Sequence, residues 1–171
     1  MIKKAAIIPT GDEIVSGIVL DTDSPAIMGE LLGLNGGMLV LRMPPVPDSE
    51  LAISGAIQGC AASYCDVIVL IGGSGEGHRH SNILGRDVTR SILETLLEEK
   101  CTSRLYGKNG HLWSELVIGR LGRALVFNVP GPYEEALAVT RAFARTFADD
   151  SDDLQAMNDA MRDALRAKYG G

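Results

Sequence analysis

The sequence is short of the features that mark secreted, membrane-spanning and zinc-binding proteins. It has three cysteines, an odd number, and none of them stands in a Cys-x-x-Cys pair. We therefore expect no disulfide framework and no zinc site, but reduced and partly buried thiols in a cytoplasmic protein. The first apolar run, residues 5–8, ends at Pro9 and is too short for a signal-peptide core or a membrane span.

Long basic clusters are also missing. No run of Lys or Arg exceeds two residues, and the formal net charge of the 171 residues is -6. Because the usual electrostatic footprint of a nucleic-acid-binding protein is absent, we expect no nucleic acid partner. Hydrophobic residues make up 46% and charged residues 22% of the chain, which is typical of a compact domain and not of a disordered one.

Strand and helix patterns alternate along the chain. Apolar runs bounded by turn residues predict strands at residues 4–8, 38–43, 66–71 and 123–129. Helical spacing predicts a helix after each strand, with Ser24 as the first N-cap, starts near Asp48 and Asp87, and a last helix over 134–147. This order predicts an α/β fold, a three-layer sandwich in which helices cover both faces of a mostly parallel sheet.

The end of the chain differs in composition from the rest. Residues 149–153 read Asp-Asp-Ser-Asp-Asp, and an apolar face then recurs at helical spacing through Leu154, Met157, Met161 and Leu165. We therefore predict a main domain over residues 1–148. An acidic linker and an accessory helix of the same domain would follow at residues 149–171.

Turn residues gather at the predicted carboxyl ends of the strands, at residues 9–12, 44–48, 72–75 and 128–131. In an open parallel sheet the ligand crevice lies beyond these ends. Gly72-Gly73-Ser74-Gly75 follows a buried strand directly, and glycine N–H groups can cradle an anion. The turn lacks the Lys of a P-loop and the spacing of a dinucleotide fingerprint, so a tight turn without a ligand is the alternative.

Four carboxylates stand at or near predicted strand ends and helix starts: Asp12, Asp21, Asp48 and Asp87. Two carboxylates beside a phosphate cradle favour Mg²⁺, which takes oxygen ligands and keeps several waters. For each residue the alternative is a helix N-cap, a position that suits Asp48 and Asp87.

The three histidines give a weaker signal. His78 and His80 flank Arg79 in the loop after the glycines, and His111 joins them only if folding brings it near. A His-x-His pair could bind a metal and Arg79 an oxyanion, but a solvated or ligand-touching loop is the alternative that we favour. No Ser-His-Asp or Cys-His pairing has a recognisable local context, so covalent catalysis is not predicted.

Taken together, these segments resemble the molybdopterin-binding domain shared by molybdenum-cofactor biosynthesis proteins. The matching pieces are Thr10-Gly11-Asp12-Glu13-Ile14 with Gly17, Asp21-Thr22-Asp23, Val46-Pro47-Asp48, Gly72-Gly73-Ser74-Gly75, Arg86-Asp87-Val88-Thr89 and Phe127-Asn128-Val129-Pro130-Gly131. They occur in the order that the family has and cover roughly residues 4–147.

The resemblance implies a molybdopterin adenylyltransferase, a nucleotidyltransferase that transfers AMP from Mg·ATP to molybdopterin and releases pyrophosphate. Asp48 and Asp87 match the family's paired acidic residues and would be the catalytic residues and the Mg²⁺ ligands. The implied substrate-binding residues are Thr10, Gly11, Asp12, Gly72, Gly73, Ser74, Gly75, Ser114, Asn128, Pro130 and Gly131. The resemblance also implies a homo-oligomer, with a trimer favoured.

The sequence departs from the family pattern at several points. Ser74 stands where Thr is usual, Glu115 stands where Arg is usual, and residues 76–85 lengthen the connection between the glycines and Asp87. An alternative function is therefore a non-catalytic molybdopterin- or nucleotide-binding module that acts as a carrier or regulator. A nucleotide pyrophosphatase, similar to the N-terminal domain of competence-damage-inducible proteins, ranks lower because the paired acidic residues of its loop are not found.

Overall fold

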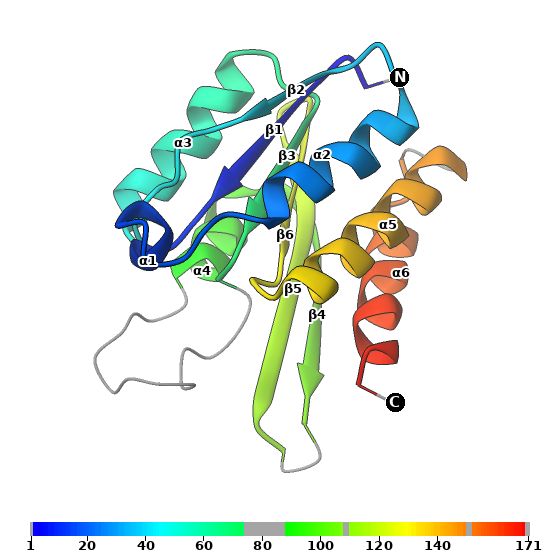
Figure 1. Cartoon of the computed structure of the whole chain (residues 1–171). Coiled ribbons are helices and arrows are strands. Elements are labelled where there is room, and N and C mark those ends of the chain that lie inside the picture. The colour runs from blue at the N-terminus through cyan, green and yellow to red at the C-terminus, as the bar shows by residue number, and fades with distance from the viewer. Residues whose placement is uncertain (1, 74–87, 108–109, 150–151, 170–171) are drawn as a thin grey trace.

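The protein is described by a computed structural model that covers residues 2–73, 88–107, 110–149 and 152–169 (Figure 1). In chain order the elements are β1 (Lys4–Pro9), α1 (Asp12–Val15), α2 (Asp23–Leu34), β2 (Leu39–Arg42), α3 (Glu50–Ala62), β3 (Val67–Ile71), α4 (Val88–Leu96), β4 (Glu99–Tyr106), β5 (Leu112–Leu121), β6 (Ala124–Val129), α5 (Tyr133–Asp149) and α6 (Leu154–Ala167). No helix in these ranges is long and apolar enough to cross a membrane.

The predicted α/β fold is confirmed. The strands form a 6-stranded sheet in the order β2-β1-β3-β6-β5-β4. The strands β2, β1, β3 and β6 run parallel to one another, whereas β5 pairs antiparallel with both β6 and β4. The four strands that the sequence predicts are the parallel ones, and the hairpin of β4 and β5 was not predicted.

Helices cover both faces of the sheet, as Figure 1 shows. One hydrophobic core joins one face of the sheet to α2, α5 and α6, and a second joins the other face to α3 and α4. In β1, Ala5 and Ile7 belong to the first core, and Ala6 and Ile8 belong to the second. Successive side chains of a strand point to opposite faces, so a strand covered on both sides is apolar at every position.

The last helix is fixed by contacts with β4. Asp153 caps its start by accepting a hydrogen bond from the N–H of Ala156 at 2.8 Å. Met157 and the apolar residues that follow it at helical spacing are fully buried in the first core. Asn158 donates from Nδ2 to the carbonyl of Cys101 on β4 at 3.3 Å, so α6 is held to the sheet by polar as well as apolar contacts.

Two helix starts differ from the sequence-based interpretation. The helix expected to start after Ser24 begins at Asp23, and Asp21 Oδ1 accepts from the N–H of Ser24 at 3.0 Å, so the capping oxygen belongs to Asp21. The N-cap of α3 is Ser49, whose Oγ accepts from the N–H of Ala52. Asp48 is therefore not the helix cap, and its carboxylate is left for another role.

Gly119 on β5 lies very close to the start of β4 and to Leu97, just after the end of α4. A Cβ atom at this position would lie 2.2 Å from the carbonyl oxygen of Glu99 and 3.0 Å from Leu97 Cδ1. We expect Gly119→Ala to lower the free energy of unfolding by about 2 kcal/mol, because the backbone of the neighbouring strand must move. Urea denaturation measures the change.

Gly59→Ala is the matched control for this substitution. Gly59 is exposed within α3, and a Cβ atom there would have no neighbour within 4 Å. Gly59→Ala should therefore raise the free energy of unfolding by about 0.5 kcal/mol, because alanine reduces the backbone entropy of the unfolded chain. Equal effects of the two substitutions would contradict the close approach at Gly119.

Candidate functional site

The connections that leave β1 and β3 pass to opposite faces of the sheet. After β1 the chain continues into α2, which packs with α5, and after β3 it continues into α4, which packs with α3. In an open α/β sheet, a ligand crevice is expected at the carboxyl ends of adjacent strands whose connections diverge in this way. The residues at this switch point are Thr10 and Gly11 after β1 and Gly72 and Gly73 after β3.

Backbone hydrogen bonds join these turns to one another. Thr10 donates to the carbonyl of Ile71 from its N–H at 3.0 Å and from its buried hydroxyl at 2.8 Å. The N–H of Gly11 donates to Val46 and the N–H of Gly72 to Val129, both at 3.0 Å. The floor of the crevice is therefore held in a fixed geometry, which suits a preformed binding site.

Gly72 has a backbone conformation that requires glycine. Its φ is 99°, in the region that side chains with a Cβ rarely adopt. A Cβ atom would also lie 2.9 Å from Thr10 Oγ1 and 3.2 Å from the Thr10 carbonyl oxygen. Gly73 follows with a φ of 67°. Gly72 and Gly73 therefore begin a tight turn directly after β3, and Ser74 and Gly75 lie outside the described residues.

Three carboxylates form the acidic end of the crevice: Asp12 and Glu13 at the start of α1, and Asp48 shortly before α3. Asp12 Oδ1 accepts from the N–H of Asp48 at 3.3 Å. Glu13 folds back over Gly11, since a Cβ atom on Gly11 would lie 2.7 Å from Glu13 Oε1. The pKa of Asp48 is raised, first by partial burial of its carboxyl group and then by the negative charges of Asp12 and Glu13.

The acidic end fits Mg²⁺ by the chemistry of its donors. Mg²⁺ prefers carboxylate oxygens and commonly takes one or two of them together with phosphate oxygens and water. Burial and, after it, the negative charges of Asp12 and Glu13 raise the pKa of Asp48, and a divalent cation would offset those charges. Within the described ranges no group of three or more His, Cys, Asp or Glu side chains is arranged to hold a metal by itself. Asp87, the second predicted ligand, lies outside the described residues.

Asp21, the remaining carboxylate of the sequence analysis, has structural partners. It accepts from Arg42 Nε at 2.7 Å as well as from the N–H of Ser24. Burial alone would raise its pKa, but the hydrogen bonds from Ser24 and Arg42 outweigh burial and lower it. Asp21 is therefore already neutralised by the protein and is a poor candidate for a metal ligand.

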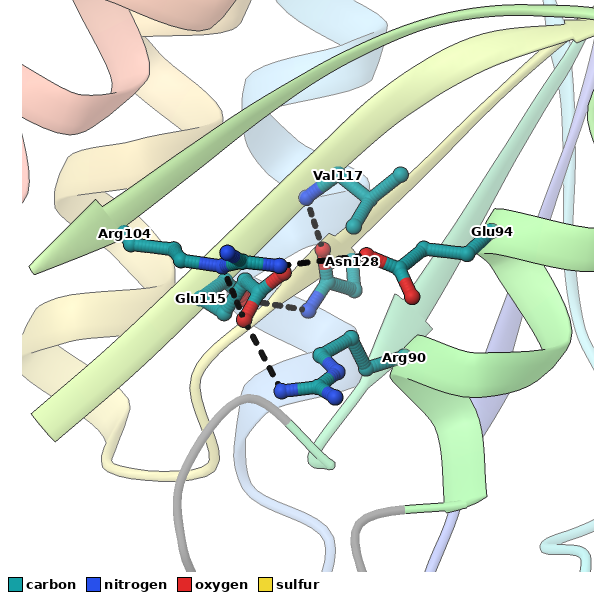
Figure 2. A network of polar contacts seen from close by, with 6 residues as sticks. All are labelled: Arg90, Glu94, Arg104, Glu115, Val117 and Asn128. Atoms are coloured by element: carbon teal, nitrogen blue, oxygen red, sulfur yellow. Dashed lines mark hydrogen bonds and ion pairs between the residues drawn. The ribbon is translucent and has the colours of Figure 1, made fainter. Parts of the chain in front are cut away.

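At the β5 end of the crevice the structure assembles an arginine cluster, made of Arg90, Arg104 and Glu115 (Figure 2). Glu115 Oε2 accepts from Arg90 Nη1 on α4 at 3.0 Å and from Arg104 Nε on β4 at 3.2 Å. The Glu115 side chain is 1% exposed, whereas that of Arg104 is 52% exposed. The sequence pattern marked Glu115 only as a departure from a family and did not single out either arginine.

Asn128, a predicted ligand-binding residue, is fully buried and connects β6 to β5 (Figure 2). Its Oδ1 accepts from the N–H of Val117 at 2.7 Å, and its Nδ2 donates to the carbonyl of Glu115 at 3.0 Å. Pro130 is buried and Gly131 is exposed at the turn that follows. These residues form the wall of the crevice at the carboxyl end of β6.

Ser114 lies on the opposite face of β5 from Glu115. Its side chain is buried, and its Oγ has no hydrogen-bond partner within the described part of the chain. Ser114 pairs with Leu105 on β4, and the register shift between Leu105 and Tyr106 marks a β-bulge at this position. The preceding residue on β5, Trp113, packs against Tyr169 with a ring-centroid distance of 3.7 Å.

Of the three histidines of the sequence analysis, the structure describes only His111. His111 closes the β4–β5 hairpin by accepting a hydrogen bond from the N–H of Gly107 on its carbonyl at 2.9 Å. His78 and His80, with Arg79, lie outside the described residues.

A pocket at the opposite edge of the sheet offers no comparable chemistry. It has a volume of about 460 Å³ and lies at the amino ends of the parallel strands. Its arginines are paired with aspartates, Arg120 with Asp152 at 2.9 Å and Arg123 with Asp66. Asp66 is itself engaged by the N–H groups of Lys3 and Lys4, so its role is structural.

Solved structures of the same fold match nearly the whole chain. A molybdenum cofactor biosynthesis protein from Corynebacterium diphtheriae superposes with a TM-score of 0.66 at 18% identity, covering 94% of this chain and 99% of its own. The molybdopterin biosynthesis enzyme MoaB from Thermus thermophilus has a TM-score of 0.60 at 21% identity, with 94% and 97% covered. CinA from Thermoplasma acidophilum, a protein of unknown function, has a TM-score of 0.60 at 18% identity, with 85% and 98% covered. At these identities the likeness establishes the fold.

The sequence itself identifies the family. No curated protein matches it, but the family model described as "Probable molybdopterin binding domain" matches residues 6–150. This range begins in β1 and passes the end of α5, so it includes both glycine turns, the acidic end and the arginine cluster. The chain belongs to the molybdopterin-binding domain family of molybdenum cofactor biosynthesis.

Proposed function

We propose that this protein is a molybdopterin adenylyltransferase that transfers AMP from ATP to molybdopterin with Mg²⁺ and releases pyrophosphate. The observation that carries the proposal is the crevice at the switch point, where rigid glycine turns stand beside the acidic end. Backbone N–H groups at such turns suit phosphate oxygens, and carboxylates suit the cation that accompanies a polyphosphate. A site for a neutral ligand would need neither feature.

The residues of the crevice have distinct roles under this proposal. Asp48 and Asp12 would hold Mg²⁺ together with Asp87, and the bound ion would offset charge on the transferring phosphoryl group. The glycine turn of Gly72 and Gly73 brings the backbone close to the phosphates. Ser114, whose buried hydroxyl has no partner among the described residues, would donate to the pterin from β5.

A non-catalytic binding module would use the same crevice, so turnover is the quantity to measure. We expect isothermal titration to detect binding of molybdopterin and, separately, of Mg·ATP. A coupled assay should then detect pyrophosphate release only when both are present. Pyrophosphate release that does not require molybdopterin would indicate a nucleotide pyrophosphatase.

Omission of Mg²⁺ is the control for the proposed mechanism. It should abolish release while molybdopterin binding persists, because only the nucleotide needs the cation. Binding of both ligands without any release of pyrophosphate would reject the transferase and leave a binding module.

A further inference from the structure

Two of the three cysteines come together where α3 ends. The N–H of Cys65 donates to the carbonyl of Cys60 at 3.1 Å. One residue earlier, the N–H of Tyr64 donates to the carbonyl of Ala61 at 3.0 Å, and Tyr64 has a φ of 60°, the left-handed conformation that glycine usually supplies at this position. These features define a Schellman motif, whose usual side-chain contact joins the positions that here hold Cys60 and Cys65. The way in which the helix ends therefore places two thiols side by side.

The backbone spacing of this pair suits a disulfide bond. Both side chains are buried in the second core, so they face the same apolar interior. With standard backbone dimensions, the 3.1 Å hydrogen bond between Cys65 and Cys60 keeps their Cα atoms within about 7 Å. Disulfides in proteins span about 4.4–6.8 Å between Cα atoms, so the two sulfurs can join with little movement of the main chain.

The two thiols are not equivalent. Burial raises the pKa of both, that of Cys60 to about 11, so the pair rests in the reduced and protonated form. The positive charge of Lys4 and a hydrogen bond from the Cys60 thiol act in the opposite direction on the pKa of Cys65 and favour its thiolate. Lys4 is held beside the pair because its Nζ donates to the carbonyl of Ser63 at 2.7 Å. Cys65 is therefore the attacking sulfur, and Cys60 is the second thiol that completes the bond.

We propose that Cys60 and Cys65 form an oxidation site, at which a small disulfide such as glutathione disulfide converts the two thiols into an internal disulfide bond. The Cys65 thiolate attacks one sulfur of glutathione disulfide, which breaks the S–S bond of the oxidant, forms a mixed disulfide and releases one glutathione. The Cys60 sulfur then loses its proton, attacks the Cys65 sulfur and displaces the second glutathione. The two electrons and two protons that the pair loses leave in two molecules of reduced glutathione.

The oxidation site lies away from the crevice, so it goes beyond the proposed function and does not depend on it. Cys65 stands just before β3 begins, which places the pair at the amino ends of the parallel strands, whereas the crevice is at their carboxyl ends (Figure 1). Ser63 and Tyr64, which separate the pair from solvent at the end of α3, are exposed. A local opening of this last turn gives a small oxidant access to the thiols. The bond would then fasten the end of α3 to the start of β3.

The test treats the full chain with glutathione disulfide, blocks the remaining thiols, and measures intact mass and chymotryptic peptides without reduction. We expect the internal bond to lower the mass by about 2 Da, because two hydrogen atoms are lost. Cleavage after Tyr64 should leave two peptides that separate only on reduction. Cys101 is the internal standard, since it is partly exposed on β4 and packs against the other core. It should take up one glutathione and form no internal bond.

Two variants separate the roles of the sulfurs. Cys60→Ser should stop at the mixed disulfide on Cys65, because no second thiol is left to displace the glutathione. Cys101→Ser is the matched control, which also removes one cysteine but should form the internal bond as the unaltered protein does. Oxidation of Cys101→Ser should raise its melting temperature by roughly 5 °C, because closing a six-residue loop restricts the unfolded chain.

Three results would overturn the oxidation site. The first is a pair that stays reduced while glutathione disulfide oxidises Cys101 or added free cysteine. The second is a stable mixed disulfide on Cys65 in the unaltered protein, which would show that Cys60 cannot reach it. The third is a fall in melting temperature when the bond forms, which would show that the bond does not fit the folded state.

Discussion

Under the proposed adenylyltransferase function, replacing Asp48 with Asn should lower AMP transfer about 100-fold or more while leaving the protein folded, because the substitution removes a charge that would help to stabilise the transition state. Asp48 is free for this role since Ser49, and not Asp48, caps α3. The carboxylate of Asp48 faces those of Asp12 and Glu13, and an amide cannot replace it as a charged Mg²⁺ ligand. The rate of pyrophosphate release at saturating Mg·ATP measures the effect.

The same substitution should raise stability slightly at neutral pH. The folded protein raises the pKa of Asp48 above its ordinary value of 3.8, so the folded state holds this proton more tightly than the unfolded state. The resulting stability is present at lower pH and is lost as the pH rises through the raised pKa. The uncharged amide introduced by Asp48→Asn does not repel the neighbouring carboxylates, and we expect a gain of less than about 1 kcal/mol because the site is partly exposed.

The control for Asp48→Asn is Glu50→Gln, which removes one negative charge from the first turn of the same helix. It should leave AMP transfer unchanged, because Glu50 is not a proposed Mg²⁺ ligand and is not among the carboxylates that raise the pKa of Asp48. If both substitutions reduced transfer equally, the effect would come from net charge and not from a position at the metal. If Asp48→Asn transferred AMP at the normal rate, Asp48 would have no catalytic role.

Two of the strands that the sequence predicts, β1 and β3, are buried on both faces. β1 and β3 are apolar at nearly every position, so their pattern is unambiguous. β4 alternates between exposed and buried positions only near its end, and its segment is rich in polar residues. The pair Asn109-Gly110, a strong hairpin signal, is the sequence feature that could have predicted the β4–β5 pair.

The residues of the candidate site also differ in whether the sequence predicts them. Gly72 and Gly73 are predictable because a glycine run directly after a buried strand is a local pattern. The arginine cluster is not local, since its members come from α4, β4 and β5 and meet only through the register that pairs Arg104 with Glu115. The approach of Glu13 to Gly11 was also missed, because acidic residues in a first helical turn have an ordinary explanation in the helix dipole.

The side chain of Asn128 joins β6 to β5 beyond the last backbone hydrogen bonds between these two strands. The last residue of β5 paired with β6 at this side is Ile118, opposite Phe127. Beyond it, the side chain of Asn128 takes over by accepting from the N–H of Val117 and donating to the carbonyl of Glu115. An amide side chain has the same donor and acceptor groups as a peptide unit, so it extends the ladder into the wall of the crevice.

Asn128→Ala should therefore lower the free energy of unfolding by about 3 kcal/mol, because two buried backbone groups lose their partners. For a domain of this size that corresponds to a fall in melting temperature of roughly 10 °C. The matched control is Asn35→Ala, since Asn35 also donates to one carbonyl, that of Ile2, and accepts from one N–H, that of Gly37. Asn35 is partly exposed, so water replaces its hydrogen bonds and we expect a loss of less than about 1 kcal/mol.

The comparison of Asn128→Ala with Asn35→Ala separates a structural role from a ligand contact. A large loss of stability with Asn128→Ala, measured without ligand, would show that Asn128 holds the wall in place before anything binds. Normal stability combined with a loss of molybdopterin affinity would instead show that its amide serves the ligand directly. Because both of its backbone bonds are short and fully buried, we expect the first outcome, with affinity reduced only through movement of β5 and of the arginine cluster that Glu115 braces.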